Sequence, residues 1–263
     1  MQTRKEFMIR ENRIKKGLKE GKSYIGTFAK ITDPCVVEIF SYIGFDFVIV
    51  DNEHTQMNKE SMVNLVRTAG NSDIVPTVRI KNNDPVEILQ ALDCGALGVQ
   101  VPMTDTREIV QMVADSAKYA PLGNRGYSAS HRAGAYGFMD ATKYAQMANE
   151  NTMVAVYCET RKAMENLEEM LKVDQVDIIF IGPFDLTQAL GVIGQPRHPL
   201  VIEAIGEITK KTRAAGKAVG IIASDAPMTR QWLDMGIQYI ALSSDQAMIG
   251  YAGRQFMREL GRK

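Results

Sequence analysis

Residues 152–187 read TMVAVYCETRKAMENLEEMLKVDQVDIIFIGPFDLT and decide the fold. They contain two apolar runs, residues 153–158 and 176–181, with a segment of helical spacing between them. Glu159 follows the first run, and Asp185 comes shortly after the second. Continuous Val- and Ile-rich runs that alternate with helical segments are typical of buried parallel strands in βαβ units. The stretch therefore predicts two neighbouring parallel strands, each followed by a carboxylate.

These two carboxylates are expected to meet. Consecutive parallel strands of one sheet lie side by side, so Glu159 and Asp185 should converge at one edge. Two adjacent carboxylates repel each other unless a cation lies between them, and hard oxygen ligands suit Mg²⁺ or Mn²⁺. A metal-free role in salt bridges is the alternative.

The rest of the chain extends the same pattern. Eight strand-then-helix units in 263 residues predict a (β/α)8 TIM barrel, with an open doubly wound sheet as the alternative. The expected strands are 23–28, 45–50, 74–80, 98–101, 153–158, 176–181, 218–223 and 239–242. The expected helices are 34–42, 59–69, 84–94, 107–117, 139–148, 162–171 and 247–260.

Composition sets further limits. Hydrophobic residues make up 45% of the chain, which is enough for a single domain over residues 1–263. The formal charge is zero, so nothing indicates a nucleic-acid or membrane partner, and no apolar segment is long enough to span a bilayer. Three widely spaced cysteines without a CxxC motif favour a reducing cytoplasm. The basic residues of segment 1–22 are interpreted as a solvated helix face.

Reactive side chains recur at the predicted strand ends, where TIM barrels build their active sites. Besides the two carboxylates, Asp51, His54 and Arg79 stand there. A metal held by the carboxylates can polarise an α-keto acid, a guanidinium can stabilise the oxyanion, and His54 titrates near neutral pH as a general base. We interpret Asp51 as a partner of Arg79 or His54. No lysine is recognised at a strand end, which disfavours Schiff-base chemistry.

Strand alternation assigns the faces of the fifth strand. If Glu159 points into the barrel mouth, Tyr157 lies just beneath it, and Cys158 points outward among the helices as a buried structural thiol.

Five segments of the chain resemble a known family in the same order. They are FDFVIVDNEHT, VPTVRIKNNDPVEILQALDCGALGVQVPM, YAPLGNRGYS, CETRKAMENL and DIIFIGPFDLTQALG. The chain resembles the metal-dependent (class II) pyruvate aldolases, which include 4-hydroxy-2-oxoheptanedioate aldolase and 2-dehydro-3-deoxyglucarate aldolase. The resemblance implies a barrel of the phosphoenolpyruvate/pyruvate-binding type and a carbon–carbon lyase. Such an enzyme reversibly cleaves a 4-hydroxy-2-oxo acid to pyruvate and an aldehyde, through a pyruvate enolate that Mg²⁺, Mn²⁺ or Co²⁺ stabilises.

The resemblance also implies roles for individual residues. His54 is the base, Arg79 stabilises the transition state, and Asp93 raises the basicity of the histidine. Glu159 and Asp185 are the metal ligands. Asp185 is also expected to contact the substrate, together with Tyr157, Gly182, Pro183 and Phe184.

Three positions depart from the family pattern. Tyr157 stands where the family has glutamine, Phe184 where it has a small residue, and Asn52 where it has glycine. The two aromatic rings put the aldehyde pocket in doubt, while the enolate machinery is intact. Two other readings stay open, an oxaloacetate-type β-keto acid decarboxylase and a catalytically silent keto-acid-binding homologue.

The resemblance further implies a homohexamer, built as a dimer of trimers. The N-terminal helix and the C-terminal helix are expected at subunit interfaces. Loop 119–136 is expected to cover the rim, bind a phosphate or contact a neighbouring subunit, and the resemblance favours a lid combined with a subunit contact.

Overall fold

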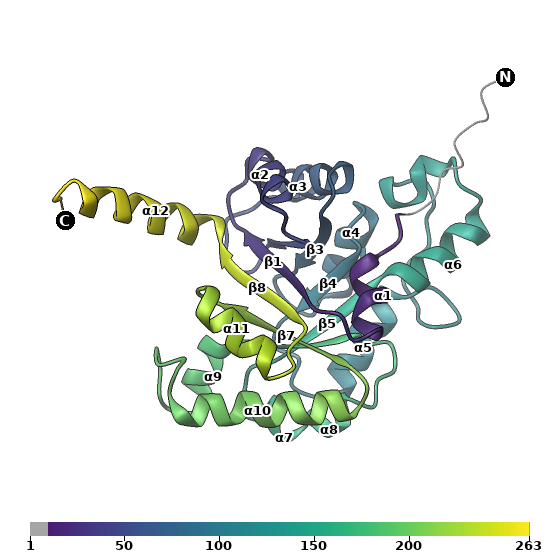
Figure 1. The fold of residues 1–263 in the computed structure, drawn as a ribbon. Helices are drawn as coiled ribbons and strands as arrows, with labels where there is room; N and C mark the ends of the chain where they lie inside the picture. Colours follow the sequence, from purple (N-terminus) through teal and green to yellow (C-terminus); the bar gives the residue numbers. More distant parts are fainter. Residues whose placement is uncertain (1–9, 263) are drawn as a thin grey trace.

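The computed structural model describes residues 10–262 as a closed barrel of eight parallel strands (Figure 1). Each strand pairs with the next in chain order, and β8 closes the ring by pairing with β1. The (β/α)8 barrel is therefore confirmed, and the open doubly wound sheet is wrong. The strands are β1 (Tyr24–Ala29), β2 (Phe47–Asp51), β3 (Val75–Arg79), β4 (Gly98–Val101), β5 (Met153–Cys158), β6 (Ile178–Ile181), β7 (Ala218–Ala223) and β8 (Tyr239–Ser244).

Most helices follow a strand and pack around the barrel. They are α1 (Arg13–Lys19), α2 (Cys35–Ile43), α3 (Lys59–Asn71), α4 (Pro85–Asp93), α5 (Arg107–Ala117), the 3-10 helix η1 (Arg132–Gly137), α6 (Ala141–Asn151), α7 (Arg161–Glu165), α8 (Leu167–Met170), α9 (Pro183–Ala189), α10 (Pro199–Ala214), α11 (Ala226–Asp234) and α12 (Asp245–Glu259). Local capping explains several starts. Asp84 and Thr106, for example, accept hydrogen bonds from the first turns of α4 and α5. The helix predicted over 162–171 is divided at Asn166.

Alternating side chains along the strands create two cores. One fills the barrel and includes Ala155, Tyr157 and Phe180, while the other lies between the barrel and its helices and includes Cys158. The expected faces of the fifth strand are thus confirmed. Burial raises the pKa of the Cys158 thiol to about 12, which fits an inert structural thiol.

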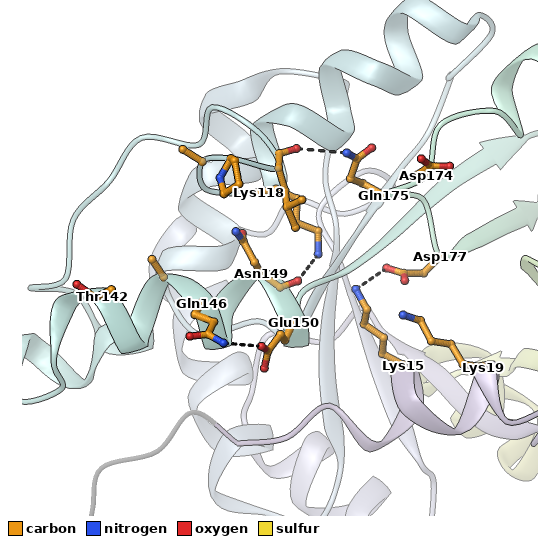
Figure 2. Close-up of a pocket in the computed structure, with 14 residues that line it drawn as sticks. Lys15, Lys19, Lys118, Thr142, Gln146, Asn149, Glu150, Asp174, Gln175 and Asp177 are labelled. Carbon is orange, nitrogen blue, oxygen red and sulfur yellow. Dashed lines mark hydrogen bonds and ion pairs between the residues drawn. The ribbon is translucent and has the colours of Figure 1, made fainter.

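Helix α1 closes the end of the barrel where the strands begin. Its buried residues Ile14 and Leu18 belong to the core inside the barrel, so the helix has an apolar face as well as a solvated one. The same end holds two lysines, Lys15, which pairs with Asp177 at 3.2 Å, and Lys118, which donates to the Asn149 carbonyl oxygen at 2.8 Å (Figure 2). Both also donate to the Thr152 carbonyl oxygen, each at 2.7 Å. Residues 1–9 of the predicted N-terminal segment lie outside the described residues.

Helix α12 takes a different course from the other helices. It extends away from the barrel (Figure 1), and Ile249, Tyr251, Phe256 and Leu260 are more than half exposed at or near it. This helix therefore presents an apolar surface that its own barrel does not cover. No helix within residues 10–262 is long and apolar enough to cross a membrane.

Candidate active site

Glu159 and Asp185 are placed by adjacent strands. Glu159 directly follows β5, and Asp185 stands in the first turn of α9, just after β6. The β5–β6 register pairs Cys158 with Ile181, so both chain ends leave the barrel together. A Cβ atom at Gly182 would lie 2.5 Å from Glu159 Oε2 and 3.3 Å from Asp185 Oδ2. The two carboxylates thus turn toward one point, which only glycine leaves open.

The surroundings of Glu159 favour a bound cation. The residue is only 5% exposed, and its Oε1 accepts a hydrogen bond of 2.9 Å from the backbone N–H of Met103. Met103 has φ 54°, an uncommon left-handed conformation that often marks functional sites. Burial first, then repulsion from Asp185 and Glu53, raises the pKa of Glu159 to about 7. A divalent cation would relieve both effects.

The donor set fits Mg²⁺ or a similar ion. No cluster of three or more His, Cys, Asp or Glu residues that would hold a metal occurs in the described part of the chain. Two carboxylates nevertheless suffice for a hard cation that keeps several waters and takes further oxygens from its substrate.

Arg79 lies at the end of β3 and is held by two carboxylates. Its Nε and Nη2 donate to Asp51 Oδ1 and Oδ2 at 3.0 and 2.7 Å, and its Nη1 lies 3.0 Å from Glu53 Oε2. The guanidinium also lies 4.8 Å from the centre of the Phe28 ring. Burial alone would raise the pKa of Asp51, but the hydrogen bonds and charge of Arg79 lower it. The pairing of Asp51 with Arg79 is confirmed.

His54 stands on the loop after β2. Its backbone N–H donates to Asp51 Oδ1 at 3.3 Å, which anchors the turn that carries it. The imidazole is 60% exposed, and Nε2 lies 3.7 Å from Glu53 Oε2. Glu53 therefore stands between the imidazole and the Arg79 guanidinium.

A cavity of about 330 Å³ connects these groups. The predicted site residues that line it are His54, Arg79, Tyr157, Gly182, Pro183, Phe184 and Asp185. A larger hollow of about 760 Å³ lies beside Lys118 at the other end of the barrel (Figure 2), and no predicted site residue lines it. The strand-end cavity is the better candidate because it gathers the reactive side chains.

The three departures from the family pattern differ in their consequences. Tyr157 is buried on the cavity floor, where its hydroxyl donates to Gln100 Oε1 at 3.0 Å and its ring stacks on Phe180. Phe184 is 56% exposed at the rim. Asn52 does not line the cavity; its side-chain amide donates to Met62 Sδ on α3. The two aromatic residues thus shape the cavity, and Asn52 does not.

Asp93 lies far from His54 along the barrel. It is the last residue of α4, which leads from the end of β3 to the start of β4, so it stands at the opposite end of the barrel. There its Oδ1 lies 2.6 Å from Arg125 Nη2 and 3.2 Å from His131 Nε2. Among residues 10–262 of a single chain, Asp93 does not contact His54, so the predicted contact does not form within one subunit.

Loop 119–136 belongs to that opposite end. Arg125 pairs with Asp93, and Arg132 donates to the carbonyl oxygen of Cys94, just after α4. A lid over the loop's own cavity is therefore wrong, because the loop leaves α5 where the strands begin. A contact with another subunit stays a prediction.

Two residues were missed in the sequence. Lys30 directly follows β1 and lines the cavity, so the prediction that no lysine stands at a strand end is wrong. His131 lies beside Asp93, with its Nε2 3.2 Å from Asp93 Oδ1. A strand boundary placed one residue later would have revealed Lys30, whereas nothing local in the sequence links His131 to Asp93.

Known proteins are similar to this chain over most of its length. Residues 24–250 match the family described as HpcH/HpaI aldolase/citrate lyase. A 2-dehydro-3,6-dideoxy-6-sulfogluconate aldolase from Pseudomonas putida is 33% identical over 88% of this chain and 90% of its own length. A 4-hydroxy-2-oxo-heptane-1,7-dioate aldolase from Shigella sonnei is 34% identical over 95% of each chain.

Solved structures agree with these matches. The crystal structure of an HpcH/HpaI aldolase/citrate lyase family protein from Burkholderia cenocepacia superposes with a TM-score of 0.89 at 28% identity, and the match covers 95% of this chain and 99% of that one. The matched region contains every side chain described above from β1 to α9. The chain belongs to the HpcH/HpaI aldolase/citrate lyase family.

Proposed function

We propose that the protein reversibly cleaves a 4-hydroxy-2-oxo acid to pyruvate and an aldehyde. Family membership makes the chain an enzyme of the aldolase and lyase class. The observation that carries the proposal is the meeting of Glu159 and Asp185 above Gly182, beside a cavity that Arg79 and His54 also line. This arrangement supplies a cation site, a fixed positive charge and a proton acceptor around one small space.

Glu159 and Asp185 are the residues that would hold the metal. A bound divalent ion would supply positive charge that polarises the keto group of the substrate. We propose Mg²⁺, Mn²⁺ or Co²⁺ as this ion. Met103 fixes one oxygen of Glu159, which orients the carboxylate before any ligand arrives.

Arg79 stabilises negative charge in this reaction, and His54 transfers a proton. In the cleavage direction His54 takes the proton from the 4-hydroxyl group, the C3–C4 bond breaks, and the electron pair moves toward the keto oxygen. Arg79 stabilises that developing negative charge, and Asp51 and Glu53 hold its guanidinium in place. Protonation of C3 completes pyruvate. Tyr157, Gly182, Pro183 and Phe184 form the surrounding wall.

The assembly belongs to the same proposal. The exposed apolar face of α12 supports a homo-oligomer, for which we propose the hexamer of two trimers. The apolar face of α1 packs in its own barrel, so α12 is the better supported contact. In such an assembly Asp93 would act on a neighbouring subunit's site. A single domain and a cytoplasmic location also remain proposals.

Proton NMR of pyruvate in D₂O tests the proposed chemistry without knowledge of the aldehyde. With the purified protein and Mg²⁺, Mn²⁺ or Co²⁺, the methyl signal should disappear as deuterium replaces its protons. The same signal should persist with chelator. Absence of exchange with all three ions would contradict the proposed enolate chemistry.

A further inference from the structure

Lys15 and Lys118 bring two ammonium groups together at the end of the barrel where the strands begin (Figure 2). Lys15 lies on α1, and Lys118 directly follows α5. Both Nζ atoms lie 2.7 Å from the carbonyl oxygen of Thr152, so the two nitrogens are close neighbours. Lys118 is only 2% exposed, so little water screens its charge. The two ammonium groups therefore repel each other inside the protein.

The protein offsets these two charges only in part. Asp177 Oδ2 lies 3.2 Å from Lys15 Nζ, and no other carboxylate among residues 10–262 pairs with either ammonium group. Lys118 donates instead to the carbonyl oxygens of Asn149 and Thr152, at 2.8 and 2.7 Å. Burial first, then repulsion from Lys15, lowers the pKa of Lys118 to about 7. An anion beside the two lysines would relieve that repulsion.

Each of the two ammonium groups keeps one N–H for a ligand. An ammonium has three donors. Lys118 uses two of them on backbone carbonyl oxygens, and Lys15 uses two on a carbonyl oxygen and Asp177. The third donor of each has no acceptor in the described part of the chain. Lys19 is exposed one turn further along α1 and lines the same cavity, where it adds a third positive charge.

The cavity that these lysines line has room for more than a single ion. Its volume is about 760 Å³, which is within the range of small-molecule sites. Ala120, Pro121 and Leu122 give it an apolar wall. A molecule with an anionic head and a small organic body would therefore meet both a charged corner and an apolar surface.

Two further carboxylates line the cavity but do not pair with the close lysines. Glu150 accepts a hydrogen bond of 3.2 Å from Gln146 on its own helix (Figure 2). Asp174 also lines a neighbouring hollow with Lys217, with which it interacts electrostatically. These two acidic groups disfavour a second negative charge, so the organic body of the ligand should be neutral.

We propose that this cavity binds the phosphate or carboxylate head of a small organic molecule, with Lys15 and Lys118 as its direct donors. Charge-assisted hydrogen bonds from two ammonium groups favour such a head over a neutral one. The site lies at the opposite end of the barrel from the active site, and the inference does not depend on the proposed reaction.

Isothermal titration calorimetry tests the site with inorganic phosphate as the first probe. The titration is done at pH 6.5 without added divalent ions, because Lys118 is charged below its pKa of about 7. Phosphate should bind the wild-type protein. Glycerol 3-phosphate and glycerate, titrated in the same way, compare the two head groups, and the lower Kd identifies the preferred one.

Variants then locate the bound anion. Lys15→Met and Lys118→Met should each raise the Kd by about 10- to 100-fold, the range expected for one hydrogen bond to a charged group. Lys19→Glu reverses an exposed charge and should raise the Kd by about 5-fold. Lys30→Met is the matched control. It removes a lysine that lines the active-site cavity, and it should keep the wild-type Kd.

Two results overturn the inference. One is the absence of binding of all three anions by the wild-type protein. The other is an anion located elsewhere, shown by a wild-type Kd in Lys15→Met and Lys118→Met or by loss of binding in Lys30→Met. If Lys118→Met does not fold, as judged by circular dichroism, Lys15→Met and the exposed variant Lys19→Glu decide the question.

Discussion

Arg79 and Asp51 form a two-point contact inside the barrel mouth, with 3.0 Å from Nε to Oδ1 and 2.7 Å from Nη2 to Oδ2. Asp51 is fully buried and Arg79 is 8% exposed. Removal of one partner leaves a buried charge without compensation, so Asp51→Asn should lower the free energy of unfolding by about 3–5 kcal/mol. Urea unfolding measures this loss.

Asp73→Asn is the matched control for that substitution. Asp73 also pairs with an arginine, Arg10, but its side chain is 88% exposed. Exposed ion pairs contribute less than about 1 kcal/mol, so the control should unfold nearly as the wild type does. Similar losses in the two variants would show that burial does not set the strength of the Asp51 contact.

The raised pKa of Glu159 predicts how the stability of the folded protein changes with pH. Its pKa is raised from 4.5 to about 7 in the folded protein, first by burial. Between these values the folded chain holds a proton that the unfolded chain has released. The free energy of unfolding of the metal-free protein should therefore fall as pH rises from 4.5 to 7, by on the order of 3 kcal/mol for this group. Chemical denaturation across this range measures the slope.

Two comparisons isolate the carboxylate. Glu159→Gln cannot titrate, so it should lose most of the slope, while Glu165→Gln on the exposed side of α7 should keep it. Excess Mn²⁺ should restore the stability of the wild type at pH 7 because the ion replaces the proton. A slope that is equal in all three proteins would rule out Glu159 as its source.

The sequence predicted regular elements well and long-range contacts poorly. β4, β5 and β7 match their predicted bounds, because each is a short, mainly apolar run that is followed by proline or a polar residue. The helix predicted over 162–171 is interrupted because the Asn166 side chain donates to the Asp105 carbonyl oxygen, 61 residues away. No local pattern encodes that contact.

In the candidate site too, features that depend on strand order were predicted and long-range contacts were missed. Convergence of Glu159 and Asp185 followed from strand order alone, since neighbouring parallel strands end together. Lys30 was missed because the first strand was expected to end at Phe28, whereas it continues to Ala29 and carries the lysine to the rim. The partners of Asp93 depend on how loop 119–136 packs, which periodicity does not indicate.

The lowered pKa of Lys118 predicts that the free energy of unfolding rises with pH above pH 7, opposite to the effect of Glu159 at lower pH. Burial, then repulsion from Lys15, lowers the pKa of Lys118 from 10.5 to about 7. Between pH 7 and 10.5 the unfolded chain binds a proton that the folded chain has lost, so the free energy of unfolding should rise with pH. Lys118→Met should reduce this rise in thermal unfolding scans, and Lys81→Met, which removes an exposed lysine shortly after β3, should not. Equal slopes would indicate that Lys118 stays charged.

The exposed face of α12 predicts the effect of charge on assembly. Ile249→Asp together with Phe256→Asp places two carboxylates on the apolar face and should lower the molar mass measured by light scattering. Arg254→Ala changes the same exposed helix without adding charge to that face, and it should keep the wild-type mass. An unchanged mass in the double variant would exclude this face as the subunit contact.

His54 distinguishes aldol cleavage from decarboxylation. His54→Ala should reduce kcat/KM for aldol cleavage by about 10²–10⁴, the usual contribution of a general base. Decarboxylation of oxaloacetate should lose far less, because carbon dioxide leaves without removal of a hydroxyl proton. His198→Asn is the control, since His198 caps α10 outside the cavity and asparagine keeps a capping acceptor. Equal losses in both reactions would mean that His54 positions the substrate or Glu53, and the proton of the 4-hydroxyl group would then need another acceptor at the rim.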